Sequence, residues 1–108
     1  MVTRTKRPML IHELKTWPEF FDAIERGDKT FEARWCHDRS FSVGDVLVLR
    51  DYDPKSESYT GRECAREVTY VLAGPPFLPC GLAVMGIKAT SASFRVMDDR
   101  IKRGITRE

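Results

Sequence analysis

The chain has few cysteines, and their arrangement excludes two common stabilising devices. Cys36, Cys64 and Cys80 lie far apart among 108 residues, and no C-x-x-C pair occurs. An odd number at wide spacing is not a disulfide framework, and a zinc motif needs paired ligands at short intervals. Cys36 and His37 are the only close pair of soft ligands, and they have no partner pair. We therefore expect reduced thiols and no bound metal.

A long apolar run is also missing. No stretch approaches the roughly 20 apolar residues of a membrane-spanning helix. The basic N-terminus is followed by Met9-Leu10-Ile11, which is too short for the hydrophobic centre of a signal peptide. We expect a cytoplasmic protein that has no membrane segment and no cofactor.

The chain carries little net charge. Its 18 basic and 16 acidic residues give a formal net charge of +2, which says little about partners. Basic residues gather near the two ends, in residues 4–7 and 95–107. Two basic ends can touch nucleic acid, but solvated chain ends are the interpretation that we favour for these clusters.

A helix near the N-terminus has the clearest local pattern. Thr16-Trp17-Pro18-Glu19 matches a capping box, in which Thr16 caps the helix and Glu19 reaches back to the Thr16 amide. Gly27 supplies a left-handed stop, so the pattern predicts a helix over residues 17–26. Its apolar side chains follow helical spacing and are expected in the core: Trp17, Phe20, Phe21 and Ile24.

Strands are predicted over residues 9–15, 29–35, 46–50, 62–72 and 82–88. Residues 46–50 are apolar on both faces, which is typical of a central strand. Gly86, in the last strand, indicates a bulge or a close backbone approach. One helix is too few for a parallel α/β sheet. We expect an α+β, mainly β fold: a small mixed β-barrel of about five strands with the helix at one end.

The predicted single domain covers residues 1–88, and residues 1–8 are expected to be loose. Residues 89–108 form either a tail or a short helix. Phe94, Met97 and Ile101 lie at helical spacing, and Gly104 is a possible stop.

Residues 29–34, K-T-F-E-A-R, carry the most informative polar pattern of the chain. Side chains alternate along a strand, so Thr30, Glu32 and Arg34 share one face. They present a hydroxyl, a carboxylate and a guanidinium close to the ammonium of Lys29. The opposite face can join the core and holds Phe31, Ala33 and Trp35. We predict a cradle for a polar ligand between the helix end and this strand.

Several motifs together resemble a known family. The sequence is similar to the ASCH division of the PUA-like superfamily at H-E-L-K (12–15), G-D-K-T-F-E-A-R (27–34), D-R (38–39) and V-G-D (43–45). More narrowly, it resembles the small phage and bacterial branch called DUF3850, which D-Y-D-P (51–54), Y-T-G-R (59–62) and V-T-Y-V-L (68–72) also fit. The resemblance spans residues 10–88 and implies a small β-barrel with a cleft beside the helix. It also implies an association with RNA or modified nucleosides.

The resemblance places Lys29, Glu32 and Arg34 in the cleft, and the strand pattern adds Thr30. Lys29 can hold an anion or, if desolvated, accept a proton. Glu32 can accept a hydrogen bond from the exocyclic amine of a base. Arg34 can bind a carbonyl or a phosphate, or simply pair with Glu32.

His12 and Lys15, on the neighbouring first strand, can complete this ligand-binding set. Structural roles compete with these functional ones. Glu32 and Arg34 can form a solvated ion pair worth under about 1 kcal/mol, and a lone histidine such as His12 is more often a satisfied, half-buried side chain. Trp35 or an aromatic residue of the helix can stack a base only if it is exposed.

The leading hypothesis is a module that binds RNA or a modified nucleoside and is not an enzyme. Some relatives in the resembled division hydrolyse the acetyl amide of acetylated cytidine with a lysine, a threonine and a distant glutamate. Here Lys29 is present, Glu32 stands at the threonine position, and residues 73–81 hold no acidic residue where the glutamate is expected. Glu63 or Glu67 can substitute if the geometry allows. An amidohydrolase that uses Lys29 and Glu32 is the second hypothesis, and a phage accessory protein that binds a host protein is the third.

Overall fold

The computed structural model describes residues 8–37, 39–90 and 106–107. These residues form one helix and six strands: β1 (Ile11–Thr16), α1 (Pro18–Arg26), β2 (Phe31–Trp35), β3 (Val46–Asp53), β4 (Ser58–Ala73), β5 (Leu82–Ala89) and β6 (Thr106–Arg107). Residues 1–7, which make up most of the segment expected to be loose, and the helix suggested around residues 94–101 lie outside the described residues.

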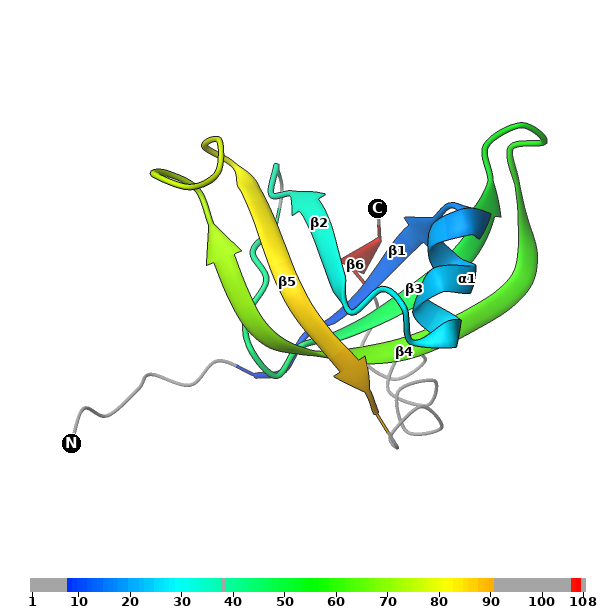
Figure 1. Ribbon diagram of the computed structural model, residues 1–108, viewed down its shortest axis with the longest axis horizontal. Coiled ribbons are helices and arrows are strands. Elements are labelled where there is room, and N and C mark those ends of the chain that lie inside the picture. The colour runs from blue at the N-terminus through cyan, green and yellow to red at the C-terminus, as the bar shows by residue number, and fades with distance from the viewer. Residues whose placement is uncertain (1–7, 38, 91–105, 108) are drawn as a thin grey trace.

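The strands join one sheet in the order β2-β5-β4-β3-β1-β6. β1 runs parallel to β3 and β6, whereas the other neighbours are antiparallel. The sheet curls into a half-barrel, and α1 lies beside β1 and β3 (Figure 1). The predicted mainly β fold, with about five substantial strands and one helix near the N-terminus, is confirmed.

β3 runs through the middle of the sheet and is buried on both faces. Val46, Leu47, Val48 and Leu49 are each at most 4% exposed, which confirms the predicted central strand. Apolar burial is the main favourable term in folding, so β3 anchors the sheet. The main core joins Leu47 and Leu49 to Leu14, Phe21, Ile24, Phe41, Val68, Met85 and Ile87. A second cluster consists of Ile11, Val46, Val48 and Ala65.

α1 begins one residue later than predicted, and its capping differs. Trp17 is the N-cap, and no side chain caps the helix, so the predicted capping box is wrong. The reason is that Thr16 is the last residue of β1, where its buried hydroxyl donates to the Leu14 carbonyl at 3.4 Å. Gly27 ends the helix with a φ of 85°, as predicted, because glycine adopts this left-handed geometry without strain. Within the described residues, no helix is long and apolar enough to cross a membrane.

The apolar stripe of α1 is only partly buried. Phe21 and Ile24 are at most 3% exposed and belong to the core. Trp17 and Phe20 are 49% and 44% exposed, so their predicted place in the core is wrong. The helix has nine residues and lies at the open side of the half-barrel, so only part of its apolar stripe, Phe21 and Ile24, is covered by the core.

β4 is 16 residues long and curves strongly along the sheet (Figure 1). Its ladder with β5 shifts register, because Val68 pairs with Ile87 whereas Tyr70 pairs with Gly86. A Cβ atom at Gly86 would lie 2.8 Å from Thr69 Oγ1, closer than side-chain atoms normally approach. The predicted bulge or close approach at Gly86 is confirmed.

β2 buries its polar face and exposes its apolar face. Glu32 is 4% exposed, whereas Phe31 and Trp35 are 47% and 53% exposed, and Ala33 is exposed as well. The expectation that the apolar face joins the core is wrong. The physical reason is the position of β2 at the end of the sheet, where its inner face looks across the open side of the half-barrel toward β1.

Side chains bridge this open side. An Arg34 Nη2 hydrogen bond to the Lys15 carbonyl, 2.7 Å long, connects β2 to β1. Among the described residues, no backbone ladder joins these two strands. We call the gap between β1 and β2, from Lys15 to Arg34, the seam.

Candidate functional site

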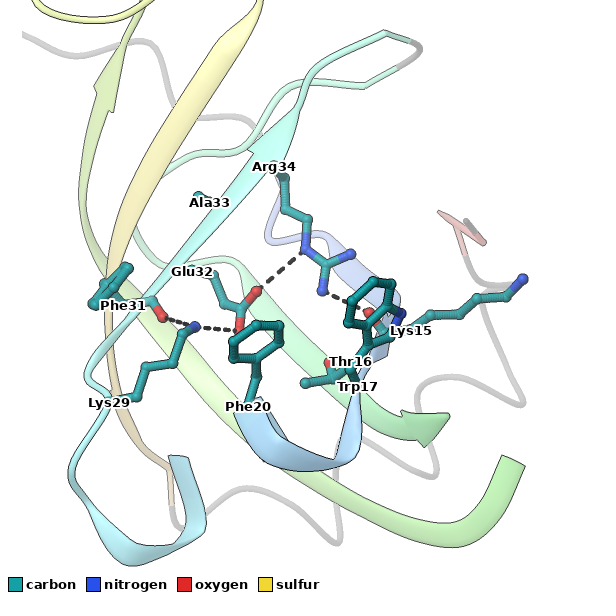
Figure 2. Close-up of a pocket in the computed structure, with 9 residues that line it drawn as sticks. All are labelled: Lys15, Thr16, Trp17, Phe20, Lys29, Phe31, Glu32, Ala33 and Arg34. Atoms are coloured by element: carbon teal, nitrogen blue, oxygen red, sulfur yellow. Dashed lines mark hydrogen bonds and ion pairs between the residues drawn. The ribbon is translucent and has the colours of Figure 1, made fainter. Parts of the chain in front are cut away.

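A cavity of about 320 Å³ opens at the seam, beside the start of α1 (Figure 2). We call it the seam cavity. The end of β1, the first turn of α1 and β2 with its preceding loop supply its wall: Lys15, Thr16, Trp17, Phe20, Lys29, Phe31, Glu32, Ala33 and Arg34. Sites for small molecules occupy about 300–1,000 Å³, so the cavity suits a small ligand or one unit of a larger ligand.

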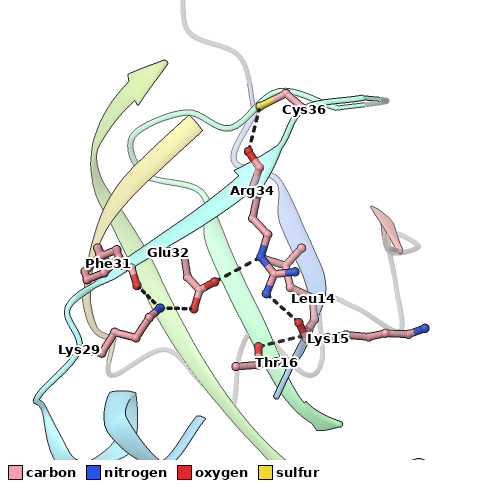
Figure 3. Close-up of polar contacts among 8 residues, drawn as sticks. All are labelled: Leu14, Lys15, Thr16, Lys29, Phe31, Glu32, Arg34 and Cys36. Carbon is pink, nitrogen blue, oxygen red and sulfur yellow. Dashed lines mark hydrogen bonds and ion pairs between the residues drawn. The ribbon is translucent and has the colours of Figure 1, made fainter. Parts of the chain in front are cut away.

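Glu32 is the buried anion of the seam cavity, and two cations hold it (Figure 3). Its Oε2 accepts from Lys29 Nζ at 3.0 Å, and its Oε1 accepts from Arg34 Nε at 3.2 Å. The three side chains are 5%, 18% and 17% exposed in the order Glu32, Lys29 and Arg34. Salt screens such partly buried pairs less than surface pairs. Pairing also offsets the cost of taking the carboxylate out of water.

Backbone carbonyls fix the two cations on either side of Glu32. Lys29 Nζ donates to the Phe31 carbonyl at 2.6 Å, and Arg34 donates to the Lys15 carbonyl across the seam. The ammonium of Lys15 itself points away from Glu32 and lies 4.7 Å from the Tyr52 ring centroid (Figure 2). Lys29, Glu32 and Arg34 therefore give the cavity a formal charge of +1, which favours an electron-rich or anionic ligand.

Three half-exposed aromatic rings surround these charges. The rings of Trp17 and Phe20 stack with 6.2 Å between centroids and 17° between planes. Phe31 projects from β2, and Lys29 Nζ lies 4.6 Å from its centroid and 5.8 Å from that of Phe20. Exposed ring faces next to cations provide both stacking surface and positive charge.

The sequence patterns missed five lining residues. Trp17 and Phe20 were assigned to the core on helical spacing, Phe31 and Ala33 were placed on the strand face expected to join the core, and Thr16 was assigned to the cap. One signal was present: Pro18 favours the first helical position, which leaves Trp17 outside the helix. Thr16 had no such signal, because only the pairing of β1 with β3 shows that it still belongs to the strand.

The structure brings together four of the six predicted site residues. Lys15, Lys29, Glu32 and Arg34 line the seam cavity, whereas Thr30 and His12 do not. Thr30 precedes β2 and is exposed.

His12 lies in the core instead of the cavity. It is fully buried, and its Nε2 lies 2.9 Å from Asp45 Oδ2. Asp45 also accepts from the backbone N–H groups of Leu10 and Ser42. The His12–Asp45 contact therefore ties β1 to the turn before β3, which is a structural role.

Within the described part of the chain, no group of three or more His, Cys, Asp or Glu side chains is arranged to hold a metal ion. Cys36, Cys64 and Cys80 are free thiols. The side chains that line the seam cavity carry ammonium, guanidinium, carboxylate, hydroxyl and aromatic groups.

Comparison with known proteins identifies the family of the chain. The family model described as "Domain of unknown function (DUF3850)" matches residues 11–87. The matched range contains every residue that lines the seam cavity. No curated protein matches the chain.

Proposed function

The chain belongs to the DUF3850 family, and from this premise and the geometry of the seam cavity we propose that it binds RNA or a modified nucleoside without catalysing a reaction. One observation carries the proposal: three half-exposed rings surround a buried carboxylate that is held between two cations. Each part of that arrangement matches one part of a nucleotide.

The rings match the flat face of a base. Stacking of a base on an aromatic side chain contributes about 1–3 kcal/mol and tolerates any base, because every base has a π face. Trp17, Phe20 and Phe31 are 44–49% exposed, so their faces are available to a ligand.

The carboxylate matches the edge of a base. Each oxygen of an ionised carboxylate has two acceptor sites, and each oxygen of Glu32 receives one hydrogen bond from a cation. The remaining capacity can accept an exocyclic amine, as carboxylates do from cytosine N4. The pair of cations also holds Glu32 in place, so its position needs no reorganisation on binding.

The cations match the phosphate and the carbonyl groups. Lys29 and Arg34 are fixed on opposite sides of Glu32, and an arginine fork suits phosphate geometry. Binding that depends on such charges weakens as the salt concentration rises, because bound counterions are released from the nucleic acid.

A labelled single-stranded RNA of mixed sequence, followed by fluorescence anisotropy at low salt, tests the proposal. We expect binding that weakens with added salt and falls about tenfold in Lys29→Ala, since a hydrogen bond to a charged group is worth about 1.5–3 kcal/mol. The matched control is Arg26→Ala, which removes the same charge from an exposed pair with Asp28 outside the cavity. Absence of binding at low salt, or equal losses in the two variants, would overturn the proposal.

We further propose that the family belongs to the ASCH division of the PUA-like superfamily. The support is the arrangement that the resemblance implied: a curled sheet with one helix and a cavity between that helix and the next strand. A cytoplasmic location fits the same proposal, since the three thiols are unpaired and reducing compartments keep thiols in this form.

A second candidate function is hydrolysis of an acylated nucleoside. The observation that favours it is that Thr16 lines the same cavity as Lys29 and Glu32. In that reaction the oxygen of water bonds to the acyl carbon, the amide C–N bond breaks, and the amine nitrogen takes a proton. Hydroxyl and ammonium groups can orient water and stabilise the oxyanion.

Incubation with N4-acetylcytidine and chromatography for cytidine and acetate tests this second candidate. Release should disappear in Thr16→Ala and persist in Thr30→Ala, since Thr30 lies outside the cavity. Unchanged acetylcytidine after prolonged incubation would reject hydrolysis and leave binding as the proposed function.

A further inference from the structure

A second cavity of about 520 Å³ lies on the other side of Arg34. Ala33 and Arg34 line both cavities, so the two cavities adjoin along β2. The other lining residues come from β1 and from the end of β2 and the loop after it: Leu14, Trp35, His37, Arg39 and Phe41. We call this second space the loop cavity.

The loop cavity has an aromatic wall. The rings of Trp35 and His37 stack with 6.1 Å between centroids and 19° between planes. Trp35 is 53% exposed and His37 is exposed. Two stacked, accessible rings form a platform on which another flat ring can stack.

The loop cavity carries basic side chains as well. Arg34 and Arg39 are the charged side chains among the described residues that line it. The seam cavity, in contrast, contains Glu32. The Glu32 carboxylate therefore suits the edge of a base in the seam cavity, whereas the described lining of the loop cavity offers stacking and guanidinium groups.

Resting on the nucleic-acid binding proposed above, we infer that the ligand is a single strand of at least two nucleotides. One base occupies the seam cavity beside Glu32, a neighbouring base stacks on the Trp35–His37 platform, and the phosphodiester between them passes Arg34. Glu32 and Trp35 are three residues apart on β2, which corresponds to about 10 Å along a strand, and their side chains lie on opposite faces. Because β2 is at the end of the sheet, the single strand passes around the edge of β2 at Arg34. Charge favours this ligand, because the phosphodiester of a single strand is attracted to guanidinium groups such as those of Arg34 and Arg39.

Isothermal titration with cytidine 5′-monophosphate and with the dinucleotide CpC tests the inference on the full chain. We expect CpC to bind about tenfold more tightly than the monophosphate, the gain of one further stacked base. In Trp35→Ala and in His37→Ala this gain should disappear, while the affinity for the monophosphate stays unchanged. The matched control is Tyr70→Ala, which removes an aromatic side chain that is 66% exposed and lines neither cavity.

Each remaining outcome contradicts the inference. Equal affinities for CpC and the monophosphate in the wild-type chain would show that the loop cavity holds no base. Equal losses for both ligands in Trp35→Ala and His37→Ala, or loss of the CpC gain in Tyr70→Ala, would show that the loop cavity is not a separate subsite. If neither ligand nor longer RNA binds, the function proposed above fails and this inference fails with it. If the monophosphate binds and CpC gains no affinity over it, the dinucleotide inference is wrong, while the proposed binding function stands.

Discussion

Two buried carboxylates, Glu32 on β2 and Asp51 on β3, are both acidic residues within strands, but they differ in their surroundings. Both are at most 4% exposed, and both pair with an arginine. Asp51 Oδ2 accepts from Thr60 Oγ1 at 2.8 Å and from Arg62 at 2.8 and 3.0 Å. No cavity residue is among these partners.

We call Asp51, Thr60 and Arg62 the Asp51 cluster, and Lys29, Glu32 and Arg34 the Glu32 cluster. The Asp51 cluster joins β3 and β4 to α1, whereas the Glu32 cluster lines the seam cavity. Arg62 also pairs with Asp22 of α1 at 2.9 Å, and its guanidinium lies 4.7 Å from the Phe21 ring centroid. The hydrogen bond to Asp22, followed in size of effect by the one to Asp51, raises the pKa of Arg62, so the guanidinium stays protonated. Burial and pairing alone therefore do not mark a functional carboxylate. What sets Glu32 apart, and supports its proposed role, is the adjacent cavity with exposed rings.

The largest expected effect separates the two carboxylates by stability. Asp51→Ala should lower the free energy of unfolding by about 2–4 kcal/mol, because it removes the shared acceptor of Thr60 and Arg62. Urea unfolding followed by circular dichroism measures this loss. RNA affinity of the folded protein should stay unchanged, and a specific loss of affinity would place Asp51 in the binding site.

The next effect concerns the rings beside Glu32. Trp17→Ala should weaken RNA binding by about 1–3 kcal/mol, the contribution of one stacked base. Phe77→Ala is the matched control, because Phe77 is 78% exposed and lies outside both cavities. In anisotropy titrations, Trp17→Ala should bind RNA more weakly than Phe77→Ala. Matching curves would show that the rings beside Glu32 do not contribute to binding, and the contrast between Glu32 and Asp51 would lose its support.

A smaller effect addresses what Glu32 recognises. Glu32→Gln should reduce the preference for cytidine over uridine by about 1 kcal/mol, since the neutral amide is a weaker acceptor for the exocyclic amine. Competition between the two nucleosides for labelled RNA measures the preference. A loss of stability as large as that of Asp51→Ala, with the preference intact, would make Glu32 a structural residue.

The smallest effect comes from Cys64, a β4 residue on which both Glu32 and Arg62 act electrostatically. Burial raises the pKa of Cys64 to about 11. As the pH rises, the thiol of the unfolded chain loses its proton before the thiol of the folded chain does. The contribution of the protonated Cys64 thiol to the free energy of unfolding is therefore complete below about pH 9 and declines as the pH rises toward 11. Mass spectrometry after brief iodoacetamide treatment at neutral pH should find the exposed Cys80 alkylated before Cys64. Faster reaction at Cys64 would contradict this burial.

Local patterns were sufficient for most of the fold and for four of the nine residues that line the seam cavity. The glycine stop of α1, the doubly buried β3 and the bulge at Gly86 follow from short-range rules, and all three are present. Lys29, Glu32 and Arg34 converge because strand alternation and one preceding loop residue already place them together. These features depend on neighbours within a few residues.

The missed features depend on distant segments. Trp17 and Phe20 have core-like spacing, but the space above them is the open seam instead of another element. Helical spacing shows that side chains share a face and does not show what covers it. His12 illustrates the reverse case, because its partner Asp45 is 33 residues away.

The sequence by itself determined the elements, the mainly β class and the run of charges after Gly27, because backbone preferences and side-chain alternation act locally. Only the tertiary structure decided which face of β2 points inward. Its inner face became polar because β2 closes the half-barrel through Glu32 and Arg34 side chains across the seam. The inward orientation of the polar face depends on contacts between β2 and β1. These strands are far apart in the sequence from the viewpoint of local rules, so the local sequence of neither strand predicts it.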